Sequence, residues 1–187
     1  IKANPADYHA DIYNLSIFHY EGIYVGMPAV FHHTSKHEGN SEGFHLIQLA
    51  CSRDLKNWKR LGNRKPFIGP SIADGENFDL TQILSPSAPV VRGDELWFYY
   101  SGLRYRATPT PPNPFMGAIC LAVLRRDGFI SLDAGQRTGE LITQPFFVRG
   151  NSLGVNLNAQ GFCSIEVLDT TGQILAISEE IRGDQPH

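Results

Sequence analysis

The sequence predicts an all-β protein, and the main observation behind this prediction is an internal repeat. Residues 21–25 (EGIYV) and 51–54 (CSRD) return in similar form as 94–98 (DELWF) and 124–127 (LRRD), both displaced by 73 positions (21 to 94 and 54 to 127). A shared displacement of this size indicates two copies of one supersecondary unit. Runs of aromatic and β-branched residues bounded by Gly, Asp, Asn and Pro indicate that each unit is built from strands.

Each copy contains four segments with strand character. They cover 12–20, 23–32, 44–52 and 58–61 in the first copy, and 83–91, 95–103, 117–124 and 129–132 in the second. Four antiparallel strands correspond to one blade of a β-propeller. We therefore expect two four-stranded antiparallel propeller-type blades, over about 11–62 and 79–134, with the excess length in the polar loop 34–43 and the proline-rich loop 105–114.

The pattern changes after the second copy. Segments 140–148, 152–158, 162–169 and 173–178 are separated by turn residues, and apolar and polar residues alternate over 153–158 and 165–167. This alternation is typical of a half-buried antiparallel meander. The aromatic second strand of the repeats is missing, so we predict a different module over 136–187, with a degenerate third blade as the alternative.

Composition excludes several classes of protein. The chain has 187 residues, a net charge of −3 and 42% hydrophobic residues. It has no basic stripe for a nucleic-acid backbone and no apolar run long enough for a membrane span, and we expect neither partner. The start has no signal-peptide core, and Cys51, Cys120 and Cys163 lack ligand spacing. We interpret these cysteines as small buried residues rather than disulfide partners, which favours a soluble protein of a reducing, cytoplasmic compartment.

Several segments resemble a known family. Residues 52–58 (SRDLKNW) are similar to the S-x-D-L-x-N-W turn of the five-bladed β-propeller glycoside hydrolases, the group that includes glycoside hydrolase families 32, 43 and 62. Further segments resemble, in order, glycoside-hydrolase-like propeller proteins with a C-terminal β-sandwich: 11–13 (DIY), 65–68 (KPFI), 78–79 (FD), 93–102 (GDELWFYYSG), 125–134 (RRDGFISLDA) and 167–172 (VLDTTG). The resemblance implies a partial propeller over 1–135 and a β-sandwich-like module over 136–187. Only two of five blades are present, as in the C-terminal part of such a propeller.

The resemblance also implies where the acids of a glycosidase would lie. Hydrolysis of a glycosidic bond uses two carboxyl groups that flank the bond. In the resembling families these acids lie on or near the innermost strands, which line a central funnel. Asp11 opens the first strand of one blade and Asp79 precedes the first strand of the next, so both are the catalytic candidates. The alternative is that each aspartate is a turn residue that binds its own backbone.

Aromatic and polar residues near strand ends are candidates for sugar binding, because sugars stack on rings and offer hydroxyl groups to polar side chains. The candidates are Tyr13, His32, His33, Tyr100, Arg104 and Tyr105. Tyr24, Trp97, Phe98 and Tyr99 fit better as core between blades, and Trp58 as packing for its own turn. His32, His33, His37 and Glu38 crowd one segment, but their spacing matches no established zinc pattern. We expect a solvated loop, no metal and no cofactor.

Two functions fit these observations. One is a glycoside-hydrolase-like enzyme that acts on oligosaccharides, and the alternative is a non-catalytic carbohydrate-binding or self-assembly module. In either case a carbohydrate is the expected ligand. Two blades leave strand edges unpaired, and soluble proteins must cover such edges. We therefore expect a homo-oligomer.

Overall fold

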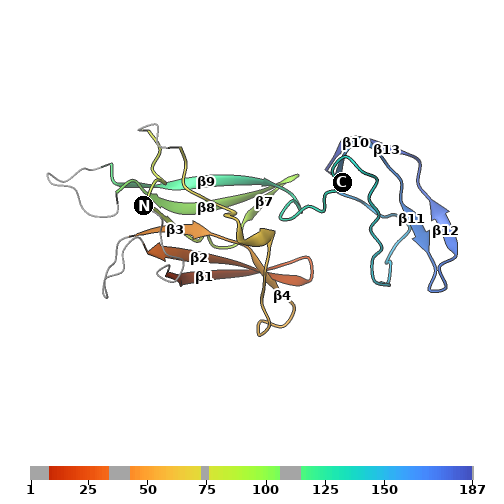
Figure 1. Cartoon of the computed structure of the whole chain (residues 1–187), viewed down its shortest axis with the longest axis horizontal. Helices are drawn as coiled ribbons and strands as arrows, with labels where there is room; N and C mark the ends of the chain where they lie inside the picture. Colours follow the sequence, from red (N-terminus) through yellow and green to blue (C-terminus); the bar gives the residue numbers. More distant parts are fainter. Residues whose placement is uncertain (1–8, 34–42, 73–75, 106–114, 187) are drawn as a thin grey trace. The chain divides into compact units, whose positions relative to one another are not determined.

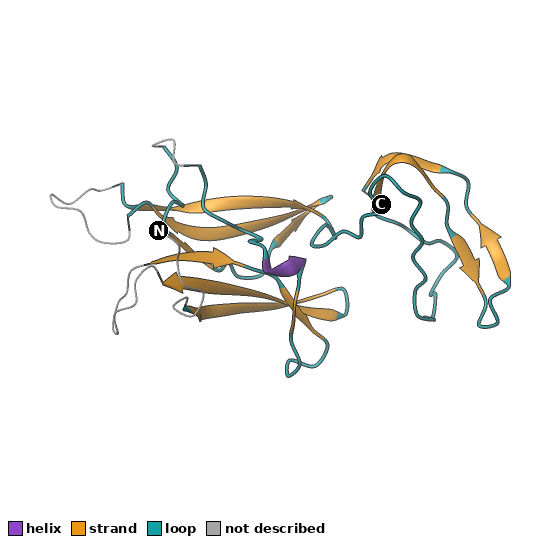
Figure 2. Cartoon of the chain, in the orientation of Figure 1, coloured by secondary structure: helices purple, strands orange, loops and turns teal. Residues whose placement is uncertain are grey.

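The structure is a computed structural model that describes residues 9–33, 43–72, 76–105 and 115–186. Within these residues the structure consists of antiparallel strands and loops with a short 3₁₀ turn at Gly62–Arg64, which confirms the all-β class (Figure 2). The chain divides into two compact units, Ile1–Leu124 and Arg125–His187, so the division comes before the predicted boundary at 135. The described part of the chain contains no helix that could span a membrane.

The first sheet has five strands: β1 (Ala10–Tyr20), β2 (Ile23–His33), β3 (Gly43–Ile47), β4 (Ala50–Ser52) and β5 (Lys59–Arg60). Its order is β1-β2-β4-β5, and β3 also pairs with β2. β3 and β4 correspond to the single predicted strand 44–52, which is interrupted opposite Pro28 of β2. A proline has no N–H to donate, so one hydrogen bond of the regular ladder is missing at this point. Instead the Gln48 N–H donates to the Pro28 carbonyl (3.0 Å).

The second sheet has four strands: β6 (Gln82–Leu84), β7 (Val90–Arg92), β8 (Glu95–Leu103) and β9 (Gly117–Arg125). β6 and β7 pair with opposite ends of β8, and β9 also pairs with β8. The predicted fourth strand at 129–132 is wrong, because these residues form no strand. The Asn156 side chain donates to the Arg126 carbonyl (2.7 Å), and the Arg125 guanidinium binds Asp184. At Arg125 the chain therefore continues into the second unit, bound to Asn156 and Asp184, instead of turning back to pair with β9.

The two tight hairpins show which residues of the two sheets are equivalent, and they correct the predicted displacement of the repeat. Tyr20 pairs with Ile23 around the turn Glu21-Gly22, and Arg92 pairs with Glu95 around the turn Gly93-Asp94. Equivalent positions at the hairpins are therefore 72 residues apart (20 to 92 and 23 to 95), and not 73. A shift of one residue moves every side chain of a strand to the other face of its sheet.

The core of the first unit lies between one face of each sheet, which we call the inner faces. On the first sheet, Phe18, Met27, Ala29 and Ile47 are buried, and on the second sheet Ile83, Leu96 and Phe98 are buried. The rings of Phe18 and Phe98 lie 6.2 Å apart. The Ser85 hydroxyl donates to the Met27 carbonyl (2.7 Å), which ties the second sheet to the centre of the first. Figure 1 shows the β1-β2 and β7-β8 hairpins at the same end of the two sheets.

The turn that carries the family resemblance is held by Asp54 and Trp58. The Asp54 carboxylate accepts hydrogen bonds from the backbone N–H groups of Lys56 and Asn57 and from the Asn57 side chain (2.7–2.9 Å). These bonds hold the pKa of Asp54 well below its usual range. The Trp58 indole donates to the Leu55 carbonyl (3.1 Å), which agrees with the prediction that Trp58 packs its own turn. Its ring also covers Gly26, where a Cβ atom would lie 2.6 Å from the ring.

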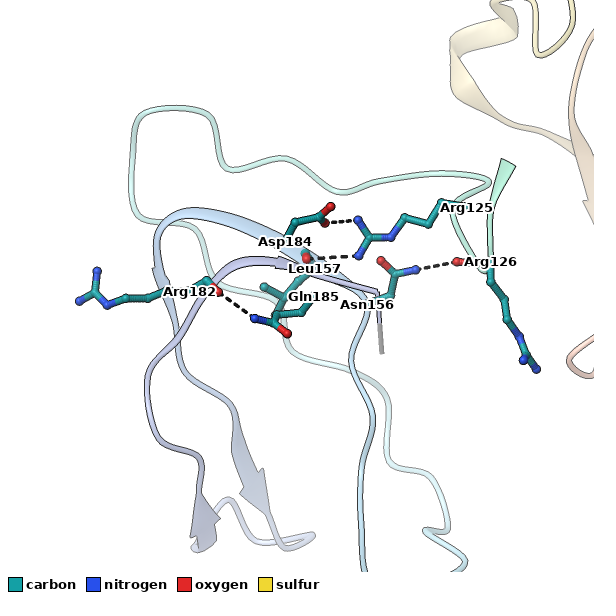
Figure 3. A network of polar contacts seen from close by, with 7 residues as sticks. All are labelled: Arg125, Arg126, Asn156, Leu157, Arg182, Asp184 and Gln185. Atoms are coloured by element: carbon teal, nitrogen blue, oxygen red, sulfur yellow. Dashed lines mark hydrogen bonds and ion pairs between the residues drawn. The ribbon is translucent and has the colours of Figure 1, made fainter. Parts of the chain in front are cut away.

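The second unit contains two separate two-stranded ladders. β10 (Leu157–Cys163) pairs with β13 (Ile181–Gln185), and β11 (Glu166–Leu168) pairs with β12 (Ile174–Ile177). The predicted strand at 140–148 is wrong, and β13 was not predicted. No side chain among residues 125–186 is buried, and Phe147 is 99% exposed. Figure 3 shows how Arg125 binds Asp184 and the Leu157 carbonyl, so that polar contacts hold the start of this unit to the β10-β13 ladder.

We predict that Gly26→Ala destabilises the first unit, because its methyl group would overlap the Trp58 ring. Overpacking of this kind costs about 1 to 3 kcal/mol of unfolding free energy. Urea unfolding followed by tryptophan fluorescence measures it. Gly69→Ala is the matched control, because its Cβ would make only an ordinary contact of 3.5 Å with Pro66. Equal stability of the two variants would contradict this packing.

Candidate functional site

Asp11 and His33 form an exposed pair at the end of the first sheet that lies away from its hairpin. Asp11 is in β1 and pairs with Phe31 of β2, two residues before His33. The His33 Nε2 atom and the Asp11 carboxylate are 2.7 Å apart. The side chain of Asp11 is 74% exposed and that of His33 is 21% exposed. The pair therefore offers a carboxylate and an imidazole to a ligand in water.

A β-bulge places Tyr13 on the same face of the first sheet as this pair. The register between β1 and β2 shifts between Ile12 and Asn14, so Tyr13 is the extra residue of β1. Bulges commonly redirect a side chain. Here the Tyr13 ring makes an edge contact with His45 (centroids 4.7 Å apart), and His45 pairs with Phe31. Tyr13 is 64% exposed, so much of this side chain is accessible to a ligand.

His32 does not join His33, because successive residues of a strand point to opposite faces of the sheet. Its ring stacks on Phe44 of β3, with centroids 5.1 Å apart. Burial and the charge of Arg60 lower the pKa of His32. The structure thus separates two histidines that are adjacent in the sequence.

Asp79 has a different environment from Asp11. It is 4% exposed, and its Oδ2 atom accepts hydrogen bonds from the hydroxyl groups of Tyr100 (2.6 Å) and Ser71 (3.0 Å). Gly102 allows this close approach, because a Cβ there would lie 2.7 Å from the Asp79 Cβ and 2.9 Å from the Cys120 sulfur. Asp79 is therefore a buried acceptor next to the inner face of the second sheet.

Two of the remaining candidates lie near Asp79: Tyr100 binds it, and Arg104 binds the segment just before it. Burial, followed by the hydrogen bond to Asp79, raises the pKa of the Tyr100 hydroxyl. Arg104 donates to the carbonyls of Asn77 (3.0 Å) and Glu76 (2.7 Å), and its guanidinium lies 4.5 Å from the Phe78 ring. Arg104 thus holds the segment that leads into Asp79. Tyr105 is half-buried and follows directly after it.

The candidates therefore form two groups on two sheets. Asp11, Tyr13 and His33 lie on the inner face of the first sheet, and Asp79 and Tyr100 lie at the inner face of the second. Both groups are at the strand ends away from the hairpins, since Asp11 pairs near the end of β2 and Asp79 contacts Gly102 near the end of β8. His32 alone points to the other face of its sheet.

The sequence reasoning missed some members of both groups. Ser71 and Cys120 contact the Asp79 group, and Phe31 and His45 lie under the Tyr13 group. Strand alternation could have placed Phe31, but His45 depends on the register across the loop before β3. The three cysteines are free, which confirms that they are not disulfide partners, but they are half-buried and not buried as predicted.

The zinc alternative concerned His32, His33, His37 and Glu38, of which His37 and Glu38 lie outside the described residues. Within residues 9–33, 43–72, 76–105 and 115–186, no group of three or more His, Cys, Asp or Glu side chains could hold a metal ion.

Comparison with known proteins adds no relative: no protein-family model, no curated protein and no solved structure matches this chain.

We predict that Tyr100→Phe lowers the unfolding free energy at neutral pH by about 1 to 2 kcal/mol, because Asp79 loses a buried hydrogen-bond donor. Tyr100 has a raised pKa in the folded protein, so its contribution is complete below the unfolded pKa of about 10 and is lost as the pH rises further. Urea unfolding at neutral and alkaline pH should show the gap between the two proteins narrowing above about pH 10. A constant gap would contradict the buried environment of this hydroxyl.

Proposed function

We propose that this chain is a carbohydrate-binding protein related to the glycoside-hydrolase-like propellers, with its sugar site around Asp11, Tyr13 and His33. The observation that carries this proposal is the hydrogen-bonded pair of Asp11 and His33 on the same sheet face as the exposed Tyr13, whose ring contacts His45. A carboxylate and an imidazole can bind sugar hydroxyl groups, and a tyrosine ring can stack on the apolar face of a sugar. The three side chains share one face of one sheet end.

Binding is favoured over hydrolysis because the two candidate acids differ in access. A glycosidase places two carboxyl groups on either side of the scissile bond. Asp11 is exposed, but Asp79 is buried and already accepts hydrogen bonds from Tyr100 and Ser71. Asp79 would have to give up these bonds and become accessible before it could act on a sugar.

The glycoside hydrolase remains the second candidate, because one observation favours it. Both acids lie at the inner faces of successive sheets and at the strand ends away from the hairpins. An enzyme would hydrolyse an oligosaccharide and would lose turnover in both Asp11→Asn and Asp79→Asn.

The test is to screen neutral oligosaccharides by thermal shift and to measure affinity for those that bind by calorimetry. Asp11→Asn should weaken binding by about 1.5 to 3 kcal/mol, roughly 10- to 150-fold, because hydrogen bonds to a charged group are lost. Tyr13→Ala should also weaken binding. Glu21→Gln is the matched control, since Glu21 is an exposed acid in the hairpin turn at the other end of the same sheet.

Three results would contradict the proposal. The first is the absence of binding to any oligosaccharide in the screen. The second is binding that Asp11→Asn and Tyr13→Ala leave unchanged, which would place the sugar elsewhere. The third is hydrolysis that Asp11→Asn abolishes, which would identify a glycosidase instead of a binding protein.

A further inference from the structure

The two sheets of the first unit pack through faces that are not equivalent. With the hairpin alignment of 72 residues, Val25, Met27 and Ala29 of β2 correspond to Trp97, Tyr99 and Ser101 of β8. Met27 and Ala29 are fully buried against the second sheet, whereas Tyr99 is 48% exposed. The second sheet instead packs with Leu96, Phe98 and Tyr100, which correspond to Tyr24, Gly26 and Pro28 on the other face of the first sheet. The two sheets therefore contribute opposite faces to the contact, an arrangement that we call head to tail.

This packing leaves exposed apolar side chains on the other face of each sheet, which we call the open face, although Gly26, Pro28 and Val30 at the centre of that face of the first sheet are buried by their neighbours. The open face of the second sheet carries the exposed residues Val90, Tyr99, Ile119, Leu121 and Val123, together with the half-buried Trp97, whose ring has the Arg92 guanidinium 4.2 Å from its centroid. Val90 pairs directly with Trp97, and the β9 residues alternate with Cys120, which lies against Gly102 at the inner face. The open face of the first sheet carries Ile12, Leu15, Ile17, Phe44 and, over Gly26, Trp58.

Each open face corresponds to a face that is buried inside the same unit. The open face of the second sheet is equivalent to the inner face of the first, and the open face of the first sheet is equivalent to the inner face of the second. The unit thus already contains one example of the contact that these two open faces could make. Contiguous exposed apolar surface of this kind marks an interaction site.

We propose that the two open faces bind each other between copies of this chain, head to tail, and repeat the internal contact between the sheets. The occupant of each open face is a second copy of this chain. The open face of the second sheet in one copy and the open face of the first sheet in another copy are equivalent to the two faces that already pack on each other inside the unit. Heterologous contacts of this type produce closed rings when the rotation closes and chains of copies when it does not. Association through sheet faces replaces the expected association through strand edges.

The test uses the full chain and one charged substitution on each open face. Ile17→Glu changes the first sheet and Tyr99→Glu changes the second, both at exposed positions. Sedimentation velocity across the micromolar range should show self-association of the unmodified protein. Each variant should need roughly tenfold or more protein to associate, because a charge would be buried without a partner. Ile72→Glu, on an exposed loop residue of the same unit, should associate like the unmodified protein.

A mixture of the two variants provides the decisive observation. Each variant keeps one intact open face, so an equimolar mixture should form pairs that stop at two copies. Circular dichroism melting confirms that the variants are folded, and Ile12→Glu with Ile119→Glu forms a second pair if either variant unfolds. The proposal is overturned if the unmodified protein stays monomeric, if either single variant associates like it, or if the mixture forms no pairs.

Discussion

The first unit depends on the packing of two inner sheet faces around Phe18, Met27, Ile47 and Phe98. These side chains are buried together, and the Ser85 hydroxyl fixes the second sheet to the backbone of β2 within the same layer. Without this contact both faces of each sheet would be exposed to solvent. The candidate site depends on the register and bulge of β1, which bring Asp11 and Tyr13 to the inner face of the first sheet.

The same packing explains why two similar acids have different properties. Asp11 lies on β1, the edge strand of its sheet, and remains exposed to water. Its hydrogen-bond partner is His33. Asp79 follows a loop that Arg104 holds against the second sheet, and Gly102 lets it approach closely enough to become buried. The burial of Asp79 makes Tyr100 a structural hydrogen-bond donor. These environments favour a ligand site at Asp11.

The hairpins and the long strands of the first unit could be predicted from the sequence, because Glu21-Gly22 and Gly93-Asp94 lie between clear aromatic and β-branched runs. The face of each strand could not be predicted, since similarity between 21–25 and 94–98 aligned the repeat one residue away from the hairpin alignment. Burial of Asp79 was also missed, because Tyr100 and Ser71 reach it through tertiary contacts. In the second unit, the apolar residues of 140–148 suggested a strand, but no partner strand pairs with them there.

The first sheet packs on the second through Phe98 and not through the opposite face of β8, which carries Tyr99. Nuclear Overhauser effects between selectively labelled Phe18, Phe98 and Tyr99 rings test this claim directly. We expect cross-peaks between Phe18 and Phe98, whose ring centroids are 6.2 Å apart, and none between Phe18 and Tyr99. Cross-peaks from Phe18 to Tyr99 without cross-peaks to Phe98 would contradict it.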